Sequence, residues 1–242
     1  MFLPSKVSAT MPRRPYLNEV LDRLKSEPRT YPLGCNLQRE GEQPQNLYYI
    51  QSGWAYAYVI LANGQRQILY LYRPGDIAGL SDVGMERVSS SLVCLSDCMV
   101  HVIPMKNLMS PEMTPRIAFH LLQKSAEIQS CLMRTLAAVG RMTARQRVAW
   151  LILMFHEKLH QRNTAASIFY IPFNQSELGD LIGLTNVSIS KVLCDLSNEG
   201  FIERNGTQIN LRRKSDLEMM VSYQTLKASA GFIGKPENIA GE

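Results

Sequence analysis

The sequence predicts an α+β protein with an N-terminal antiparallel β domain, a long helix and a C-terminal winged helix-turn-helix. Three observations carry this prediction: short β-prone runs between glycines from about Leu33 to Val102, a glycine-free stretch with helical spacing from Pro115, and a cap–turn–cap pattern followed by an Asn-Gly hairpin within 174–211. The 242 residues are 45% hydrophobic, which suffices for a folded core in one large domain or two smaller ones.

The β domain is predicted from its turn chemistry. Asn63-Gly64 tolerates the positive φ angles of a hairpin turn, and the flanking runs 54–61 and 67–72 are rich in β-prone side chains. Many short strands with a turn signal about every ten residues favour a sandwich, a roll or a barrel. We interpret the many tyrosines as sheet-packing residues.

A long helix is expected from Pro115 to about residue 139, because its apolar side chains form one stripe. At ~1.5 Å per residue it is longer than a small sheet domain needs as cover. We therefore expect the stripe to meet a second copy of the chain about a two-fold axis; the alternative is a helix packed entirely on its own domain. The predicted dimer-interface residues are Leu121, Ile128, Leu132, Leu136 and Val139.

A buried helix over about 144–161 and a short strand over 168–172 lead into the helix-turn-helix. Asn174 and Glu177 have the spacing of a capping box, so a helix should begin there. Gly183 can enter the left-handed region and supplies the tight turn after that helix.

Thr185 is expected to cap a second helix, whose N-terminal half presents short polar side chains, as a DNA-reading helix does. Asn205-Gly206 should form the wing, with basic residues on its flanks for phosphates. The alternative is a helical hairpin that only packs. The predicted DNA-binding residues are Asn174, Gln175, Ser176, Thr185, Asn186, Val187, Ser188, Ser190, Lys191, Arg212 and Arg213.

A β domain, a long helix and a winged helix-turn-helix in this order resemble the Crp/Fnr family of bacterial transcription regulators over roughly residues 20–220. The resemblance is carried by 47–53, 63–80, 145–153 and the helix-turn-helix. It implies a β-roll (double-stranded jelly roll) sensor related to cyclic-nucleotide-binding domains, and a homodimer that binds a near-palindromic promoter site and contacts RNA polymerase. The expected divisions are an N-terminal tail (1–19), the β-roll (20–113), a dimerisation helix (114–142), the DNA-binding domain (143–220) and a C-terminal tail (221–242).

The sensor departs from the cyclic-nucleotide branch of that family. The Gly-Glu pair that binds ribose there is Gly79-Leu80 here, and the Arg-Ser phosphate clamp retains Arg87, with Ser89 one position too far along. The effector-binding candidates are therefore Gly79, Arg87 and Ser89, with no effector identified, and classical cyclic-AMP binding is not expected because polar sites reject mismatched groups. Only Cys35 lies near the N-terminus, so no iron–sulfur cluster and no other cofactor are expected, as in FixK-like regulators.

The reading helix also departs from the usual family pattern Arg-Glu-Thr-Val-x-Arg, which is replaced by residues 186–191. Val187 cannot accept a hydrogen bond from cytosine, but it can pack on a thymine methyl group, and Lys191 can donate to guanine. The family's usual half-site is therefore not transferred to this chain.

The segment His156-Glu157-Lys158-Leu159-His160 matches the H-E-x-x-H zinc-protease pattern. On a helix its histidines share a face, and the glutamate could act as base on a zinc-bound water, so a zinc-dependent hydrolase is the alternative function. The extension that supplies a third histidine is absent, and the segment ends a helix. We therefore predict no metal site and no enzyme.

The net charge of +5 and the pI near 9.0 favour an anionic partner such as nucleic acid, and the helix-turn-helix makes double-stranded DNA the expected one. No run of about eighteen apolar residues is present, so no membrane association is expected. Five cysteines without paired spacing indicate a reducing cytoplasm rather than a disulfide framework.

Overall fold

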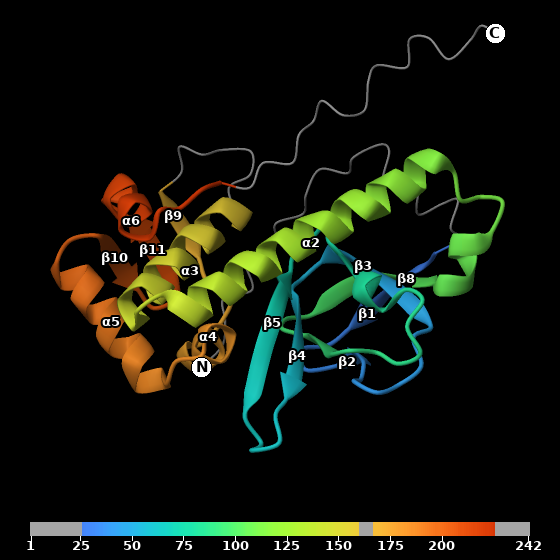
Figure 1. Cartoon of the computed structure of the whole chain (residues 1–242), viewed down its shortest axis with the longest axis horizontal. Coiled ribbons are helices and arrows are strands. Elements are labelled where there is room, and N and C mark those ends of the chain that lie inside the picture. The colour runs from blue at the N-terminus through green and yellow to red at the C-terminus, as the bar shows by residue number, and fades with distance from the viewer. Residues whose placement is uncertain (1–25, 160–166, 226–242) are drawn as a thin grey trace, which may run out of the picture.

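The computed structural model describes residues 26–159 and 167–225, and it has the predicted α+β class. The β domain lies beside the N-terminal part of the long helix α2, and a mainly helical C-terminal domain lies at the C-terminal end of that helix (Figure 1). The predicted tail 1–19 lies outside the described residues. The strands of the β domain are β1 (Pro28–Tyr31), β2 (Asn36–Gln38), β3 (Asn46–Ser52), β4 (Ala55–Ile60), β5 (Arg66–Tyr72), β6 (Ile77–Ala78), β7 (Ser91–Cys94) and β8 (Cys98–Pro104).

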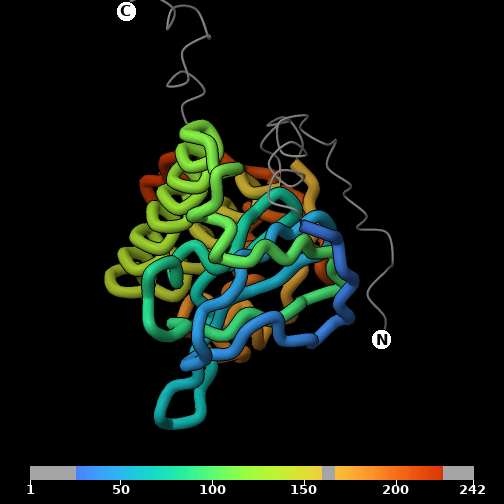
Figure 2. The backbone as a smooth tube through the Cα atoms, turned by 90° about the vertical axis from the view of Figure 1, so that its right-hand side faces the viewer, coloured from blue at the N-terminus to red at the C-terminus, as the bar shows by residue number. Residues whose placement is uncertain are grey.

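Two four-stranded antiparallel sheets, ordered β1-β8-β3-β6 and β2-β7-β4-β5, form the β-roll. The predicted hairpin is β4–β5, with Gly64 at φ 81° in its turn. Its tip projects from the body of the molecule in both views (Figures 1 and 2). Tyr48, Tyr70 and Tyr72 are buried between the sheets, which confirms the sheet-packing interpretation of these tyrosines.

The helix α2 (Pro115–Arg141) is capped by Thr114, whose side chain accepts a hydrogen bond from the Ile117 backbone N–H. The short 3-10 helices η1 (Leu80–Asp82) and η2 (Met105–Met109) precede it. Ile117 and Leu121 pack against the sheet that contains β3 and β8, so part of the predicted stripe covers the helix's own domain.

The C-terminal domain is a winged helix-turn-helix with one helix that the sequence did not predict, α6. The helix predicted over about 144–161 is described through Leu159, and its expected last residues lie outside the described ranges, as do all of 160–166. The elements are α3 (Ala144–Leu159), β9 (Ile168–Tyr170), α4 (Gln175–Ile182), α5 (Asn186–Asn198), β10 (Ile202–Asn205), β11 (Gln208–Leu211) and α6 (Lys214–Val221), with the sheet order β10-β11-β9.

The two domains share one apolar core. Trp54, Tyr56 and Ile68 lie on the face of the β4–β5 sheet that is turned away from the β-roll interior, and they join the cluster that contains Phe155 and Phe173 of the C-terminal domain. The rings of Tyr56 and Phe173 meet edge to face at 5.8 Å. An apolar interface of this kind limits the relative motion of the two domains.

Within the described ranges, no helix combines the length and the apolar character required to cross a lipid bilayer.

Candidate nucleic-acid interface

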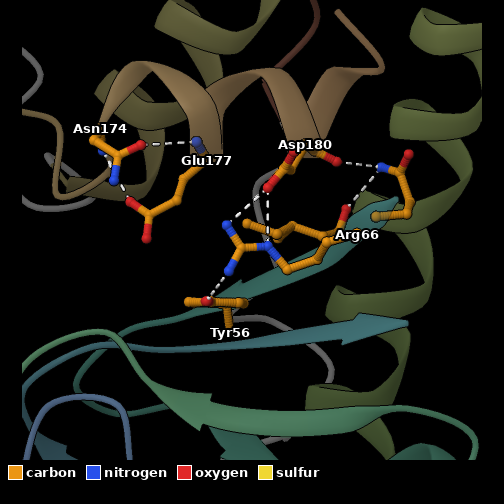
Figure 3. Close-up of polar contacts among 7 residues, drawn as sticks. Tyr56, Arg66, Asn174, Glu177 and Asp180 are labelled. Atoms are coloured by element: carbon orange, nitrogen blue, oxygen red, sulfur yellow. Dashed lines mark hydrogen bonds and ion pairs between the residues drawn. The ribbon is translucent and has the colours of Figure 1, made fainter. Parts of the chain in front are cut away.

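The first helix of the helix-turn-helix is fixed by local hydrogen bonds. Asn174 accepts from the Glu177 backbone N–H at 2.9 Å, and Glu177 accepts from the Asn174 backbone N–H at 2.9 Å, so the predicted capping box forms (Figure 3). Gly183 ends α4 at φ 64°, as predicted. A side chain on Gly179 would lie 2.3 Å from the Leu184 carbonyl oxygen, so this glycine allows the turn to pass close to the helix.

The second helix, α5, presents a polar N-terminal half to solvent. Thr185 caps it by accepting from the Ser188 backbone N–H at 3.2 Å. Ile189, Leu193 and Leu196 are buried beneath it. The exposed residues at its outer face are Asn186, Val187, Ser190 and Lys191, and Val187 is 78% exposed.

Gln175 links α4, α5 and the wing, a structural role that the sequence did not predict. With its amide nitrogen toward Asn186 Oδ1 and its amide oxygen toward both terminal nitrogens of the Arg204 guanidinium, it makes three hydrogen bonds of 3.0 Å. Arg204 also donates through Nε to the Gly206 carbonyl at 2.9 Å. The predicted phosphate contact Gln175 thus holds the wing against the start of the reading helix, whereas Ser176 is exposed.

The predicted phosphate-binding arginines beside the wing have acidic partners. Arg212 lies 2.6 Å from Glu203, and Arg213 lies 2.5 Å from Asp216. The Arg213 guanidinium also stacks over the Phe201 ring at 4.4 Å. DNA phosphates would therefore compete with these carboxylates for the two arginines.

Two further arginines, both at the start of α3, hold the C-terminal domain together. Arg145 makes two hydrogen bonds of 2.6 Å with the Glu199 carboxylate at the end of α5. The hydrogen bond from Arg145 lowers the pKa of Glu199. Arg147 donates to the Met142 carbonyl at 3.0 Å and the Ile182 carbonyl at 3.2 Å, which ties the ends of α2 and α4 to α3.

The effector-binding candidates lie in a part of the β-roll where the carboxylate of Asp82 already accepts the hydrogen bonds that Ser89 can donate. Asp82 is completely buried and accepts from the Ser89 backbone N–H at 3.0 Å and the Ser89 hydroxyl at 2.8 Å. Arg87 is exposed and donates to the Gly41 carbonyl at 2.8 Å. Gly79 is buried at φ 88°, where an added Cβ would lie 3.0 Å from the Asn46 carbonyl oxygen.

The H-E-x-x-H segment begins in the core at His156 and continues through the half-buried residues 157–159. His156 is 4% exposed and meets the Phe169 ring edge to face at 5.8 Å, and Glu157 accepts a hydrogen bond of 2.6 Å from the Tyr223 hydroxyl. His160 lies outside the described residues. Across residues 26–159 and 167–225, no three His, Cys, Asp or Glu side chains form a group that could hold a metal ion.

A β-roll joined through a long helix to a winged helix-turn-helix defines a class of DNA-binding regulator. Two family models match this chain: the cyclic nucleotide-binding domain over residues 28–110 and the Crp-like helix-turn-helix domain over 146–220. The chain belongs to the Crp/Fnr family and is a transcriptional regulator of that type.

Relatives and solved structures agree with the family assignment. The Escherichia coli K12 fumarate and nitrate reduction regulatory protein is 24% identical over 206 residues, covering 84% of this chain and 82% of that protein. The anaerobic regulatory protein of Aggregatibacter actinomycetemcomitans is 27% identical over 184 residues, covering 75% and 71%. The structure of FixK2 from Bradyrhizobium japonicum superposes with a TM-score of 0.72 at 24% identity, covering 84% of this chain and 99% of that one. The zinc-hydrolase alternative has no support among them.

Proposed function

We propose that the chain binds a near-palindromic promoter site as a homodimer, with the N-terminal half of α5 in the major groove and the wing along the backbone. The capped, solvent-exposed polar start of α5 carries this proposal, because a helix that only packed would bury that face. The two half-sites should be about one helical turn apart, roughly 34 Å.

Base preference is assigned to Asn186, Val187, Ser190 and Lys191. The exposed Val187 methyl groups can contact a thymine methyl, and the Lys191 ammonium can donate to the O6 or N7 of guanine. Thr185 and Ser188 are joined by a hydroxyl contact of 2.9 Å and orient the helix start. The proposed backbone contacts come from the two helix starts and the wing: Asn174, Gln175, Ser176, Arg212 and Arg213.

The proposed dimer seam lies on the exposed face of α2 and differs in part from the predicted stripe. Leu121 is 9% exposed and Ile128 packs against the β-roll core, so both serve the chain's own domain. Val139 lies near the turn between α4 and α5, because its Cγ1 atom would be 3.6 Å from a Cβ added to Gly183. The exposed positions follow heptad spacing, which suits a second copy of the same helix: Phe119, Leu122, Ala126, Gln129, Met133 and Leu136, with Leu132 beside them.

The sensor is proposed to work without an anionic effector. A buried carboxylate, Asp82, already takes both donors of Ser89, so a phosphate at that position would meet a like charge. Gly79, Arg87 and Ser89 remain the candidate contacts for any ligand of this region.

The remaining assignments concern the domain bounds, the protein partner and the compartment. We assign residues 20–113 to the β-roll, 114–142 to the dimerisation helix and 143–220 to the DNA-binding domain, with tails at 1–19 and 221–242. RNA polymerase is the proposed protein partner, the cytoplasm the proposed compartment, and no catalytic activity is assigned.

The test is a binding titration against duplexes selected from a random pool by the purified chain. We expect Lys191→Ala to relax base preference at one position by about 1–3 kcal/mol, and Arg212→Ala to weaken all duplexes about equally and reduce the salt slope by about 1. Lys106→Ala, an exposed lysine of η2, is the matched control and should bind as the wild type does. Binding without any sequence preference would refute the proposal.

A further inference from the structure

The start of β5, next to the turn of the β4–β5 hairpin, contacts α4, the first helix of the helix-turn-helix. Arg66 Nε lies 2.8 Å from Asp180 Oδ2, and a terminal nitrogen of the same guanidinium lies 2.7 Å from that oxygen. The other terminal nitrogen donates to the Tyr56 hydroxyl at 2.8 Å. Figure 3 shows Arg66 extending from its strand between Tyr56 and the helix that carries Asp180.

A second side chain of β5 reaches the backbone of the same helix. Gln67 Nε2 donates to the Asp180 carbonyl at 2.7 Å and the Leu181 carbonyl at 3.3 Å. These are carbonyls of the last helical turn, which have no partners within the helix. The contacts of the β4–β5 hairpin with α4 and the segment before it thus combine an ion pair, two hydrogen bonds to backbone carbonyls and the ring contact between Tyr56 and Phe173.

We propose that Arg66, together with Gln67, is a positioning residue that fixes the DNA-binding domain in the orientation that matches the half-site spacing. We call the contacts of Arg66 and Gln67 with Asp180 and Leu181 the domain clasp. The inference rests on the proposed function, since it requires a dimer that reads two half-sites.

The position of the domain clasp favours a DNA-competent orientation over a blocked one. It contacts the C-terminal half of α4, while Asn174 and Ser176 at the start of that helix remain exposed. Val187 on the reading helix is 78% exposed while the clasp is formed. The clasped chain therefore leaves the proposed interface open to DNA.

Orientation matters because the two reading helices of a dimer must enter successive major grooves. A rotation of about 10° displaces a point about 20 Å away, the length of a helix such as α5, by about 3.5 Å, which is close to the rise of one base pair. A domain free to rotate by this amount would accept several spacings and would bind each less tightly, because ordering costs free energy on binding.

The experiment measures affinity for duplexes in which the two selected half-sites are separated by spacers that differ by one base pair. We expect the wild type to prefer one spacing. Arg66→Ala should lower affinity for that spacing about tenfold, within the range of couplings between sites, and flatten the preference. Affinity for unrelated DNA should stay unchanged because the phosphate contacts remain.

Matched variants separate positioning from folding. Arg29→Ala removes an exposed arginine of β1 and should behave as the wild type. Arg66→Asp combined with Asp180→Arg should restore the spacing preference that either change alone removes. If Arg66→Ala fails to fold, as judged by thermal unfolding, Arg66→Lys and Asp180→Asn give the same readout with smaller changes.

The outcomes distinguish the two proposals. A wild type with no preferred spacing would overturn both the dimer model and the domain clasp. A wild-type preference that Arg66→Ala retains at full affinity would overturn the clasp alone, and so would tighter binding by Arg66→Ala, since the clasped orientation would then be the incompetent one.

Discussion

Gly179→Ala should destabilise the DNA-binding domain, although the same change usually stabilises a helix. An alanine in a helix interior is about 0.5–1 kcal/mol better than glycine. At this position, however, the new Cβ would lie 2.3 Å from the Leu184 carbonyl oxygen, where real Cβ atoms essentially never come within 3.0 Å. The turn must therefore open, which strains the 3.0 Å hydrogen bond from the Leu184 N–H to the Gly179 carbonyl.

Overpacking costs about 1–3 kcal/mol, and weakening one hydrogen bond adds up to about 1 kcal/mol. After subtracting the gain in helix propensity, we expect Gly179→Ala to lower the free energy of unfolding by about 2 kcal/mol. Urea unfolding followed by the fluorescence of the two buried tryptophans, Trp54 and Trp150, measures this change.

Gly140→Ala is the matched control, because Gly140 also lies in a helix but has nothing within 4 Å of an added Cβ. It should be neutral or stabilise the chain by up to about 1 kcal/mol. Equal effects of the two substitutions would refute the packing argument, since helix propensity alone would then account for both.

Three other predictions concern charge and assembly. Asp76→Ala should cost about 3 kcal/mol, measured by urea unfolding, because it leaves the buried Arg73 without the carboxylate 3.7 Å away; a loss under 1 kcal/mol would contradict this. Glu199→Gln should be less stable than the wild type at pH 7. The pKa of Glu199 is lowered by Arg145, so the stability it contributes is present above the ordinary value of 4.5 and is lost as the pH falls through the lowered value. The difference in urea midpoints should therefore close on acidification, and a constant difference would argue against the pair. Leu136→Glu should convert the proposed dimer to monomer in sedimentation equilibrium, because it places a charge at the C-terminal end of the proposed seam, where Leu136 is 73% exposed.

The helix-turn-helix could be predicted from the sequence because its signals are local. The capping box of Asn174 and Glu177 and the positive φ of Gly183 each depend on residues within a few positions of one another. The domain clasp could not be predicted, since Arg66 and Asp180 are 114 positions apart and each is an ordinary surface charge in its own segment. No local pattern distinguishes an arginine that faces solvent from one that faces another domain.

The long helix shows why one stripe was predicted where the structure has two. Its apolar residues serve its own domain on one side, at Leu121 and Ile128, and remain exposed on the other, at Leu122, Met133 and Leu136. Helical periodicity identifies apolar positions but does not say which neighbour they meet. The predicted stripe therefore mixed residues from both faces.

The ion pairs of the DNA-binding domain indicate how much of the binding free energy would come from phosphate contacts and how much from base reading. Arg145, Arg212 and Arg213 are each held by a carboxylate of the same domain, so binding a phosphate requires breaking an existing ion pair. Such contacts add less net attraction than a lysine or arginine that faces only water, and they keep sequence-independent binding weak. In the proposed complex, discrimination between sequences depends on the exposed start of α5, with Lys191 as its cation, and on how accurately the two reading helices are spaced. A regulator with few strong phosphate contacts gains more from a fixed domain orientation than one held to DNA mainly by charge, because most of its binding free energy requires both half-sites to be read in register.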